Sequence, residues 1–300
     1  MAGILSMSEH NYLSPPEIAE ATIQNGIKKT ELPVVKMIVL GILAGAFIAF
    51  AAEGSNMASY NLLSNIETYG LGKALSGAIF STGLMLVLIA GGELFTGNAT
   101  IIISVLDKKV SIKNMLKNWF FVYCGNFIGA VFVAYMMVKS GLFNSGANEL
   151  GGMTIKIASS KVGLTFAQGF YLGIMCNWLV CLAVWMATGA KDITGKILSV
   201  FFTIWLFVTS GFEHSIANMY YIPAGILAKG NENWVGAALN LGVKMKGLNS
   251  LNWKNFIIKN LIPVTFGNII GGVLFVGMAY WYVYIRNKNL SHEKSKQKSS

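Results

Sequence analysis

Residues 209–219 read Thr-Ser-Gly-Phe-Glu-His-Ser-Ile-Ala-Asn-Met and place Glu213 and His214 shortly after a glycine, inside a long apolar region. An earlier stretch, 91–99, reads Gly-Gly-Glu-Leu-Phe-Thr-Gly-Asn-Ala and also has an asparagine five residues after its glutamate. Ionisable groups at membrane depth are costly and usually face a cavity or a transport path. Glycine-interrupted apolar segments in both halves of a chain are typical of a transport site built from broken helices. The two stretches therefore predict such a site.

The composition indicates a membrane protein. The 300 residues are 54% hydrophobic and 12% charged, with a mean hydropathy of +0.56, whereas a soluble domain carries about 25% charged residues. The net charge of +10 comes from lysines between the apolar runs and at the C-terminus. At these places it indicates membrane topology and lipid-surface charge rather than binding to nucleic acid. Residues 1–33 contain acids, adjacent prolines and no apolar core, so we expect no signal peptide.

Runs of about 20 apolar residues predict six membrane spans. The uninterrupted spans are expected at about 34–53, 119–138, 162–187 and 256–285. The second span (about 73–89) breaks and resumes at 99–106, and the fifth (about 197–208) breaks and resumes at 216–227. The stretches 140–160 and 229–255 are expected to be a Gly/Asn/Ser-rich connection and a long polar loop. The predicted units are an N-terminal segment, 1–33, a transmembrane domain, 34–286, and a basic disordered tail, 287–300.

The N-terminal segment contains a typical helix start, Ser14-Pro15-Pro16-Glu17. The following residues, 18–23, allow a short amphipathic helix on the membrane or on a neighbouring subunit, and a partly ordered tail is the alternative. With six spans and both ends inside, 14 of the 23 lysine and arginine residues fall in inner segments, counting Lys36 at the inner end of the first span. This bias favours cytoplasmic termini, although the 229–255 loop carries lysines against the rule.

Each break exposes backbone groups that must be buried in protein or face a water-filled cavity. Glu93 and Glu213 are expected to accept hydrogen bonds from loop N–H groups or to cap a half-helix, in preference to a direct transport role. Asn98 and Asn218 are expected to hold the same loops. The half-helix after each break presents free N–H groups and a positive dipole end, which suits an anion.

His214 is one of three histidines, and the others, His10 and His292, lie in the terminal segments. A buried histidine is often only a packed core residue. Imidazole nevertheless titrates between about pH 5 and 8, so at a break it could hydrogen-bond an anion or exchange a proton with one. Lys161, at the start of the fourth span, could extend to the membrane interface or raise the anion concentration at a vestibule.

Five apolar residues near the breaks are either packing residues or hydrophobic constrictions of a pore: Phe80, Leu84, Leu94, Phe95 and Phe207. The three cysteines fall inside apolar runs without metal-ligand spacing. We therefore interpret them as packing residues and expect neither a metal nor a cofactor. The spans offer no clustered metal-ligand set, so a membrane enzyme is a less favoured alternative.

Three motifs resemble the hallmarks of the formate–nitrite transporter family: Glu-Leu-Phe-Thr-Gly at 93–97, Gly-Phe-Glu-His-Ser-Ile-Ala-Asn-Met at 211–219, and Ile-Pro-Val-Thr-Phe-Gly-Asn at 262–268. The similarity also covers Cys-Asn-Trp-Leu-Val-Cys-Leu-Ala-Val-Trp-Met at 176–186 and extends over about 15–286. The resemblance implies an all-α integral membrane protein with six transmembrane helices. It implies an aquaporin-like inverted repeat with broken second and fifth helices, a homopentamer in the cell membrane, and one pore in each protomer.

The resemblance also implies roles for individual residues. Leu84, Leu94 and Phe95 would form one constriction, and Phe80 and Phe207 match positions that narrow the pore. Thr96, on a mobile loop, would contact His214. Asn177 would lie near this histidine, and Lys161 would attract anions from outside.

The substrates implied are small monovalent anions: formate, nitrite, hydrosulfide and sometimes acetate or lactate. The first motif, at 93–98, reads Glu-Leu-Phe-Thr-Gly-Asn where enterobacterial formate channels carry Asp-Leu-Phe-Thr-Ser-Thr, so details of loop gating do not transfer. The second and third motifs stay close to the formate branch. Formate is therefore the expected substrate, with nitrite or hydrosulfide as the alternative. Hydrogen bonds from His214 and Thr96 would stabilise the anion. Proton donation by His214 would couple the flux to pH, because neutralising an anion removes most of its cost in an apolar constriction.

Overall fold

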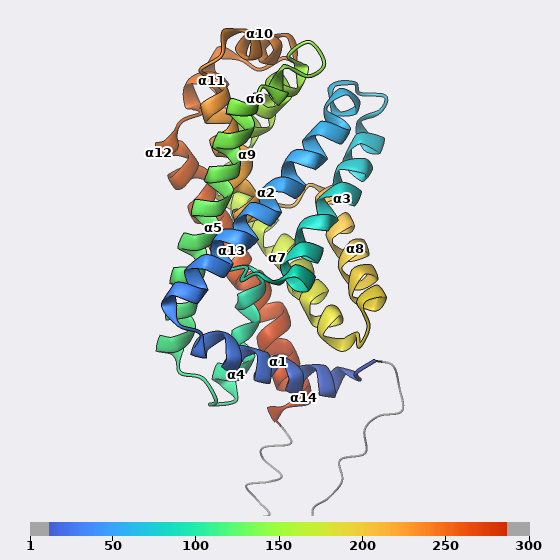
Figure 1. Cartoon of the computed structure of the whole chain (residues 1–300), viewed down its shortest axis with the longest axis vertical. Helices are drawn as coiled ribbons and strands as arrows, with labels where there is room; N and C mark the ends of the chain where they lie inside the picture. Colours follow the sequence, from blue (N-terminus) through green and yellow to red (C-terminus); the bar gives the residue numbers. More distant parts are fainter. Residues whose placement is uncertain (1–11, 287–300) are drawn as a thin grey trace, which may run out of the picture.

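The computed structural model describes residues 12–286. His10, His292 and the predicted tail, 287–300, lie outside the described residues, as do the first eleven residues of the predicted N-terminal segment. Within the described part the protein is helical, without a β-sheet, and six helices are long and apolar enough to cross a membrane. Figure 1 shows these helices running side by side along the long axis of the molecule.

The membrane-length helices follow the six predicted spans, and their bounds differ. Four are single α-helices: α2 (Val34–Ser64), α5 (Ile112–Ser140), α7 (Phe166–Gly189) and α8 (Ile193–Ser210). One is α3 (Tyr69–Met85), which continues as the π-turn η1 (Leu86–Gly91). The last joins α12 (Trp253–Asn255), η4 (Phe256–Leu261), α13 (Ile262–Gly272), η5 (Val273–Met278) and α14 (Ala279–Tyr284). Because α2 continues eleven residues past Glu53, this glutamate lies inside the helix, where its side chain accepts a hydrogen bond from Tyr220.

Both breaks in the apolar runs are present. After η1 the chain runs extended and then forms η2 (Gly97–Ile101) and α4 (Ile102–Leu106). After α8 it crosses a short non-helical link and forms α9 (Ser215–Ala228). The second and fifth membrane helices are therefore broken, as predicted.

Two stretches predicted without helices are in fact largely helical. The connection at 140–160 contains η3 (Leu142–Asn144) and most of α6 (Glu149–Val162), and the loop at 229–255 contains α10 (Glu232–Asn240) and α11 (Met245–Ser250). Their sequences are too polar and rich in glycine to indicate membrane spans. The glycines at 151 and 152 bring α6 against Trp234 and Ala237 of α10, and this packing explains the helical structure.

The N-terminal segment forms α1 (Pro15–Glu31). Glu17 accepts hydrogen bonds from both the backbone N–H and the hydroxyl of Ser14, at 2.7 and 2.6 Å, which fixes the start of the helix. Its apolar side, including Ile18 and Ile23, packs on residues of α4, α7 and α14 of the same chain. Figure 1 shows α1 crossing beneath the ends of the membrane helices next to α4 and α14.

Two glycine pairs show that the halves of the chain are built alike. Gly41 of α2 meets Gly125 of α5, and a Cβ on Gly125 would lie 3.0 Å from the Gly41 Cα. Gly173 of α7 meets Gly267 of α13 in the same way, also at 3.0 Å. Small residues let membrane helices approach closely. The chain is therefore an inverted repeat, in which α1 to α5 correspond in order to α6, α7, α8, α9 and the last membrane helix.

Candidate functional site

Each broken helix ends on a glycine in a left-handed conformation. Gly91 has φ of 99° and Gly211 has φ of 82°, a region that residues with a Cβ rarely adopt. The two glycines stand 120 positions apart, as do Glu93 and Glu213. The backbone thus leaves both helices in the same way, which explains why a glycine lies two residues before each of these glutamates.

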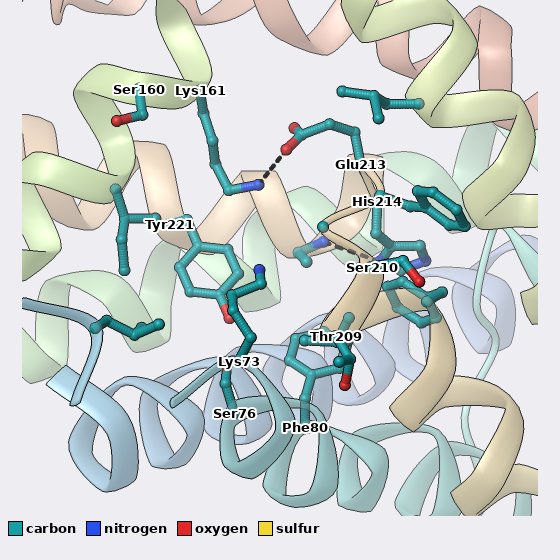
Figure 2. Close-up of a pocket in the computed structure, with 18 of the residues that line it drawn as sticks. Lys73, Ser76, Phe80, Ser160, Lys161, Thr209, Ser210, Glu213, His214 and Tyr221 are labelled. Carbon is teal, nitrogen blue, oxygen red and sulfur yellow. Dashed lines mark hydrogen bonds and ion pairs between the residues drawn. The ribbon is translucent and has the colours of Figure 1, made fainter. Parts of the chain in front are cut away.

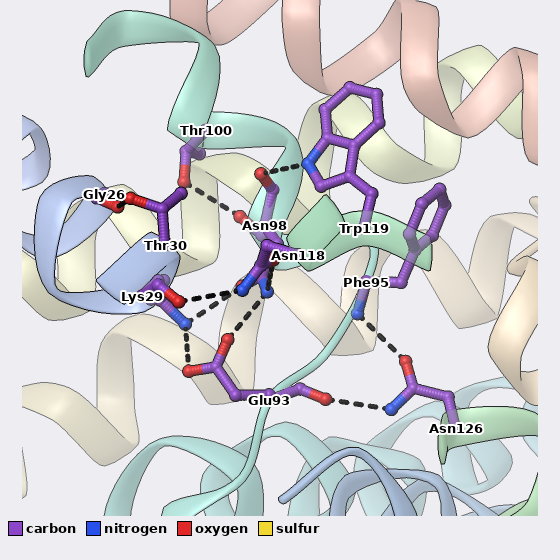
Figure 3. A network of polar contacts seen from close by, with 11 residues as sticks. Gly26, Lys29, Thr30, Glu93, Phe95, Asn98, Thr100, Asn118, Trp119 and Asn126 are labelled. Atoms are coloured by element: carbon purple, nitrogen blue, oxygen red, sulfur yellow. Dashed lines mark hydrogen bonds and ion pairs between the residues drawn. The ribbon is translucent and has the colours of Figure 1, made fainter. Parts of the chain in front are cut away.

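Glu93 lies at the centre of a buried polar network at the first break (Figure 3). It accepts hydrogen bonds from the Lys29 ammonium and from the Asn98 amide, each at 2.7 Å. Asn98 also donates to Asn118 at 2.8 Å, and its carbonyl accepts from the Trp119 indole at 2.9 Å. Lys29 therefore links α1, the N-terminal helix, to the first break.

Glu213 has a matching network at the second break. It accepts from Lys161 at 2.6 Å and from Asn218 at 2.7 Å, and Asn218 donates to Asn260 at 2.7 Å. Asn218 donates to Glu213 as Asn98 donates to Glu93, and the expectation that these asparagines hold the two loops stays a prediction. Loop N–H groups were expected as the donors to these glutamates. The donors that the structure shows are a lysine side chain from another helix and the side-chain amide of an asparagine in the half-helix after each break.

Two asparagines that the sequence analysis missed fix the backbone of the breaks. The Asn126 side chain accepts from the Phe95 N–H and donates to the Glu93 carbonyl, at 2.9 and 2.8 Å. Asn268 does the same at the second break, accepting from the Ser215 N–H at 2.9 Å and donating to the Glu213 carbonyl at 3.0 Å. A signal was available, because 125–129 reads Gly-Asn-Phe-Ile-Gly and 267–271 reads Gly-Asn-Ile-Ile-Gly.

His214 joins the two breaks. It is buried, with 3% of its surface exposed, and its Nε2 lies 2.8 Å from the Thr96 hydroxyl. Its Nδ1 accepts a hydrogen bond from the Ala217 N–H at 3.2 Å, so His214 caps α9. An Nδ1 that accepts carries no proton, which places the proton of a neutral ring on Nε2. Asn177 is close by but does not bond the ring, since its amide donates to the Thr96 carbonyl at 3.1 Å.

A cavity of about 550 Å³ ends at His214 (Figure 2). Phe80 and Phe207 line it, with ring centroids 5.9 Å apart in an edge-to-face arrangement. Lys161 and Glu213 also line it as an ion pair. The helix break thus faces a cavity that is lined by charged groups and by two aromatic rings packed edge to face.

The remaining predicted constriction residues do not line this cavity. Leu84, Leu94 and Phe95 are buried, and the Phe95 ring packs edge-on against Trp119 and Tyr123 at 5.8 and 4.8 Å. Their place in a constriction stays a prediction. Leu94 is the repeat counterpart of His214, 120 positions earlier. The two halves of the chain therefore share the helix break but differ in the side chain at this position.

Six membrane-length helices, two of them broken around a cavity that reaches a buried histidine, define a multi-pass membrane protein of the channel or transporter class. Groups of three or more histidine, cysteine, aspartate or glutamate side chains that could hold a metal do not occur among residues 12–286. The chain belongs to the formate/nitrite transporter family, because a sequence profile described as "Formate/nitrite transporter" matches residues 16–282.

Several relatives are similar over nearly their whole length. The "Probable formate transporter" of Methanothermobacter thermautotrophicus is 40% identical, covering 92% of this chain and 98% of the relative. "Formate channel FocA" of Escherichia coli K12 is 35% identical, with 92% and 96% covered. A solved structure described as "Pentameric formate channel with formate bound" has a TM-score of 0.71 and 39% identity, covering 84% of this chain and 98% of that one. A second, "FNT family ion channel", has a TM-score of 0.72 and 27% identity, with 89% and 98% covered.

Proposed function

We propose that the protein is a channel for formate and related small monovalent anions, with a pore in each protomer of a homopentamer. The observation that carries the proposal is the contact between His214 and Thr96, which joins both helix breaks at the end of the cavity. The relatives described as formate channels, and the solved formate channel described as pentameric, support the substrate and the assembly.

The proposed path begins in the cavity and passes between Phe80 and Phe207 to the pair His214 and Thr96. It then crosses the second constriction, formed by Leu84, Leu94 and Phe95. Asn177 supports the path indirectly, because it holds the Thr96 carbonyl. Lys161 raises the positive potential of the vestibule, although the Glu213 carboxylate at 2.6 Å offsets most of its charge at a distance.

The hydrogen bonding of His214 favours hydrogen-bond donation over proton donation. A neutral imidazole with its proton on Nε2 can donate to an anion, whereas proton donation requires an imidazolium. Forming the imidazolium protonates Nδ1 and breaks the bond from the Ala217 N–H. A bare anion in an apolar constriction is nevertheless costly, and formate that takes a proton from the external solution crosses more easily as the neutral acid. Flux is therefore expected to rise as the pH falls.

The second candidate function keeps the fold and changes the main substrate to nitrite or hydrosulfide. The name of the family profile includes nitrite, and apolar constrictions alone do not separate such small anions. Acetate and lactate are further candidates. We infer that the protein is not an enzyme and lies in the cell membrane with both termini in the cytoplasm, supported by the relatives' descriptions and by the lysine-rich predicted inner segments.

The decisive experiment measures the flux of formate, nitrite and hydrosulfide into liposomes that contain the purified protein, at external pH values of about 5 and 7. Two variants run alongside. His214→Asn keeps an amide donor and a residue suited to capping α9, whereas His214→Leu copies the counterpart Leu94 and removes all hydrogen bonding. Gel filtration confirms that each variant retains its assembly.

Rapid formate flux that survives in His214→Asn and is lost in His214→Leu is the expected result for a hydrogen-bond donor. Loss of flux in both variants, with intact assembly, instead supports proton donation by the imidazolium. Fast nitrite or hydrosulfide flux with little formate flux would show that formate is not the main substrate, and it would leave the assignment of the fold unchanged. Flux and pH response that are unchanged in both variants reduce His214 to a packing residue.

A further inference from the structure

The lysines that line the cavity differ in how they are paired. The lining includes Lys73, Lys156 and Lys161 together with Glu213. Lys161 forms the ion pair with Glu213 at 2.6 Å and also lies over the Tyr221 ring, at 5.3 Å from its centroid. A tight pair acts on a distant anion only as a dipole. The net attraction of the cavity for anions must therefore come mainly from the other lysines.

Lys73 lies next to the second break without a partner of its own. Between residues 12 and 286 its ammonium forms neither an ion pair nor a hydrogen bond, and a Cβ on Gly211 would lie 3.7 Å from its Nζ. Figure 2 shows its side chain extending from α3 into the cavity near Tyr221, on the same side as Lys161. Phe80 lies two helical turns further along α3. Lys73 therefore lies in the cavity lining ahead of the proposed Phe80–Phe207 constriction.

Two more side chains in the lining have buried polar atoms without a hydrogen-bond partner. The Asn56 amide nitrogen is one, and only 2% of this residue is exposed. The Thr209 hydroxyl is the other. Buried polar groups are nearly always satisfied, and an unmade hydrogen bond is costly. Both atoms have almost no exposed surface, so each donor reaches an acceptor in the cavity only after its side chain turns toward it.

We propose that Lys73, Asn56 and Thr209 form a binding site for a small carboxylate or similar oxyanion in the cavity, before the Phe80–Phe207 constriction. This inference rests on the proposed function, and it assigns the recruiting charge to Lys73 rather than to the paired Lys161. The three residues come from α2, α3 and α8, so the site is assembled only in the folded helix bundle. At the spacing of 120 positions that relates the two breaks, the residue matching Lys73 is the apolar Ile193, so the second half of the chain forms its break without a lysine at that position.

The first test measures formate flux into liposomes against formate concentration, at low and high ionic strength. In Lys73→Met the half-saturating formate concentration is expected to rise about three- to tenfold, and the loss of affinity with added salt becomes weaker. The maximal flux stays unchanged, because the pore itself is intact. Asn56→Leu, which keeps the side-chain volume and removes the donor, is expected to raise the half-saturating concentration as well.

Three variants serve as controls. Lys73→Arg keeps the charge and is expected to keep the wild-type affinity. Lys139→Met removes the same charge from the last turn of α5, outside the cavity lining, and is expected to change neither affinity nor salt dependence. Lys156→Met tests the other unpaired lysine of the lining. If it reproduces the full effect while Lys73→Met has none, the proposed site is wrong.

A second measurement does not depend on transport. Saturation-transfer NMR follows the formate proton in the presence of the detergent-solubilised protein. Transfer is expected for the wild type and for Lys139→Met, and it should be lost in Lys73→Met. Equal transfer in wild type and Lys73→Met overturns the site. If the wild-type protein binds formate in this measurement but transports none into liposomes, the proposed function is wrong and the proposed site still stands.

Discussion

At the scale of single residues, each break contains a largely buried ion pair between a lysine and a glutamate. The Glu213 side chain is 7% exposed and that of Lys161 is 16% exposed. Removing one partner of a buried pair leaves a lone charge, which costs far more than losing the pair as a whole. The pair thus fixes the loop that carries His214, and its energetic weight can be measured.

Lys161→Met is expected to destabilise the protein by about 3 kcal/mol, near the lower limit for a buried pair because Lys161 is partly exposed. The double variant Lys161→Met/Glu213→Gln is expected to recover part of this loss, since no lone carboxylate remains. Thermal unfolding of the detergent-solubilised protein measures both. A double variant that is less stable than the single one contradicts this account. The same changes at Lys29 and Glu93 provide a matched comparison at the first break.

Residues differed in how far the sequence could predict them. The glycines, glutamates and His214 could be singled out from the sequence. Ionisable residues are rare inside an apolar run, and a glycine beside them indicates where the helix can break. The roles of Lys29 and Lys161 toward the glutamates were not, because 64 and 52 positions separate the partners and only the folded bundle brings them together. Asn126 and Asn268 carried a signal only as a repeated motif, which becomes visible when the two halves are compared.

At the scale of elements, the close contact between membrane helices depends on glycines that lie against the backbone of the neighbouring helix. It does not depend on the pattern of apolar side chains. A Cβ at Gly267 would lie 2.2 Å from the Phe170 carbonyl oxygen, and one at Gly125 would lie 2.6 Å from that of Ile38. Backbone atoms cannot move aside as a flexible side chain can. The α7–α13 and α2–α5 pairs, which carry Asn268 and Asn126 at the breaks, therefore tolerate no larger residue at these points.

Gly267→Ala is accordingly expected to lower the unfolding temperature and to reduce flux, because it pushes α13 and Asn268 away from the second break. Gly236→Ala is the matched control, since it lies within α10 and a Cβ there would meet nothing within 4 Å. In the control, alanine is expected to stabilise the helix by up to about 1 kcal/mol. Thermal unfolding and liposome flux test both variants. Equal behaviour of the two would show that the helix contact is not tight.

Elements outside the membrane spans were the least predictable. The apolar runs identified the six long helices because hydropathy alone governs which segments can cross a bilayer. By contrast, α6 and α10 are short and less apolar. They are stabilised by contact with each other, and α6 also packs against α9. The correspondence between α6 and α1 becomes clear only from Lys161 and Lys29, which end these helices and bond the equivalent glutamates.

At the scale of the whole molecule, the inverted repeat places equivalent helices at opposite ends of the bundle, and the two breaks meet between them at the His214–Thr96 contact. Figure 1 shows α1 and α4 at one end, and α6, α10 and α11 at the other. The frame is symmetric, but the pore residues are not, since His214 corresponds to Leu94 and Lys73 to Ile193. An anion therefore meets different groups from the two sides, although the same backbone architecture surrounds it.

The orientation of this asymmetric path is testable with single cysteines at exposed positions of opposite ends. Lys113, in the first turn of α5, and Glu232, in the first turn of α10, are both exposed. In a background without the three native cysteines, a membrane-impermeant maleimide added to intact cells is expected to label Glu232→Cys and not Lys113→Cys. Inside-out vesicles should give the reverse, because the lysine-rich segment before α5 is retained in the cytoplasm. Labelling of Lys113→Cys from outside would invert the proposed orientation and place the Lys73 site on the cytoplasmic side.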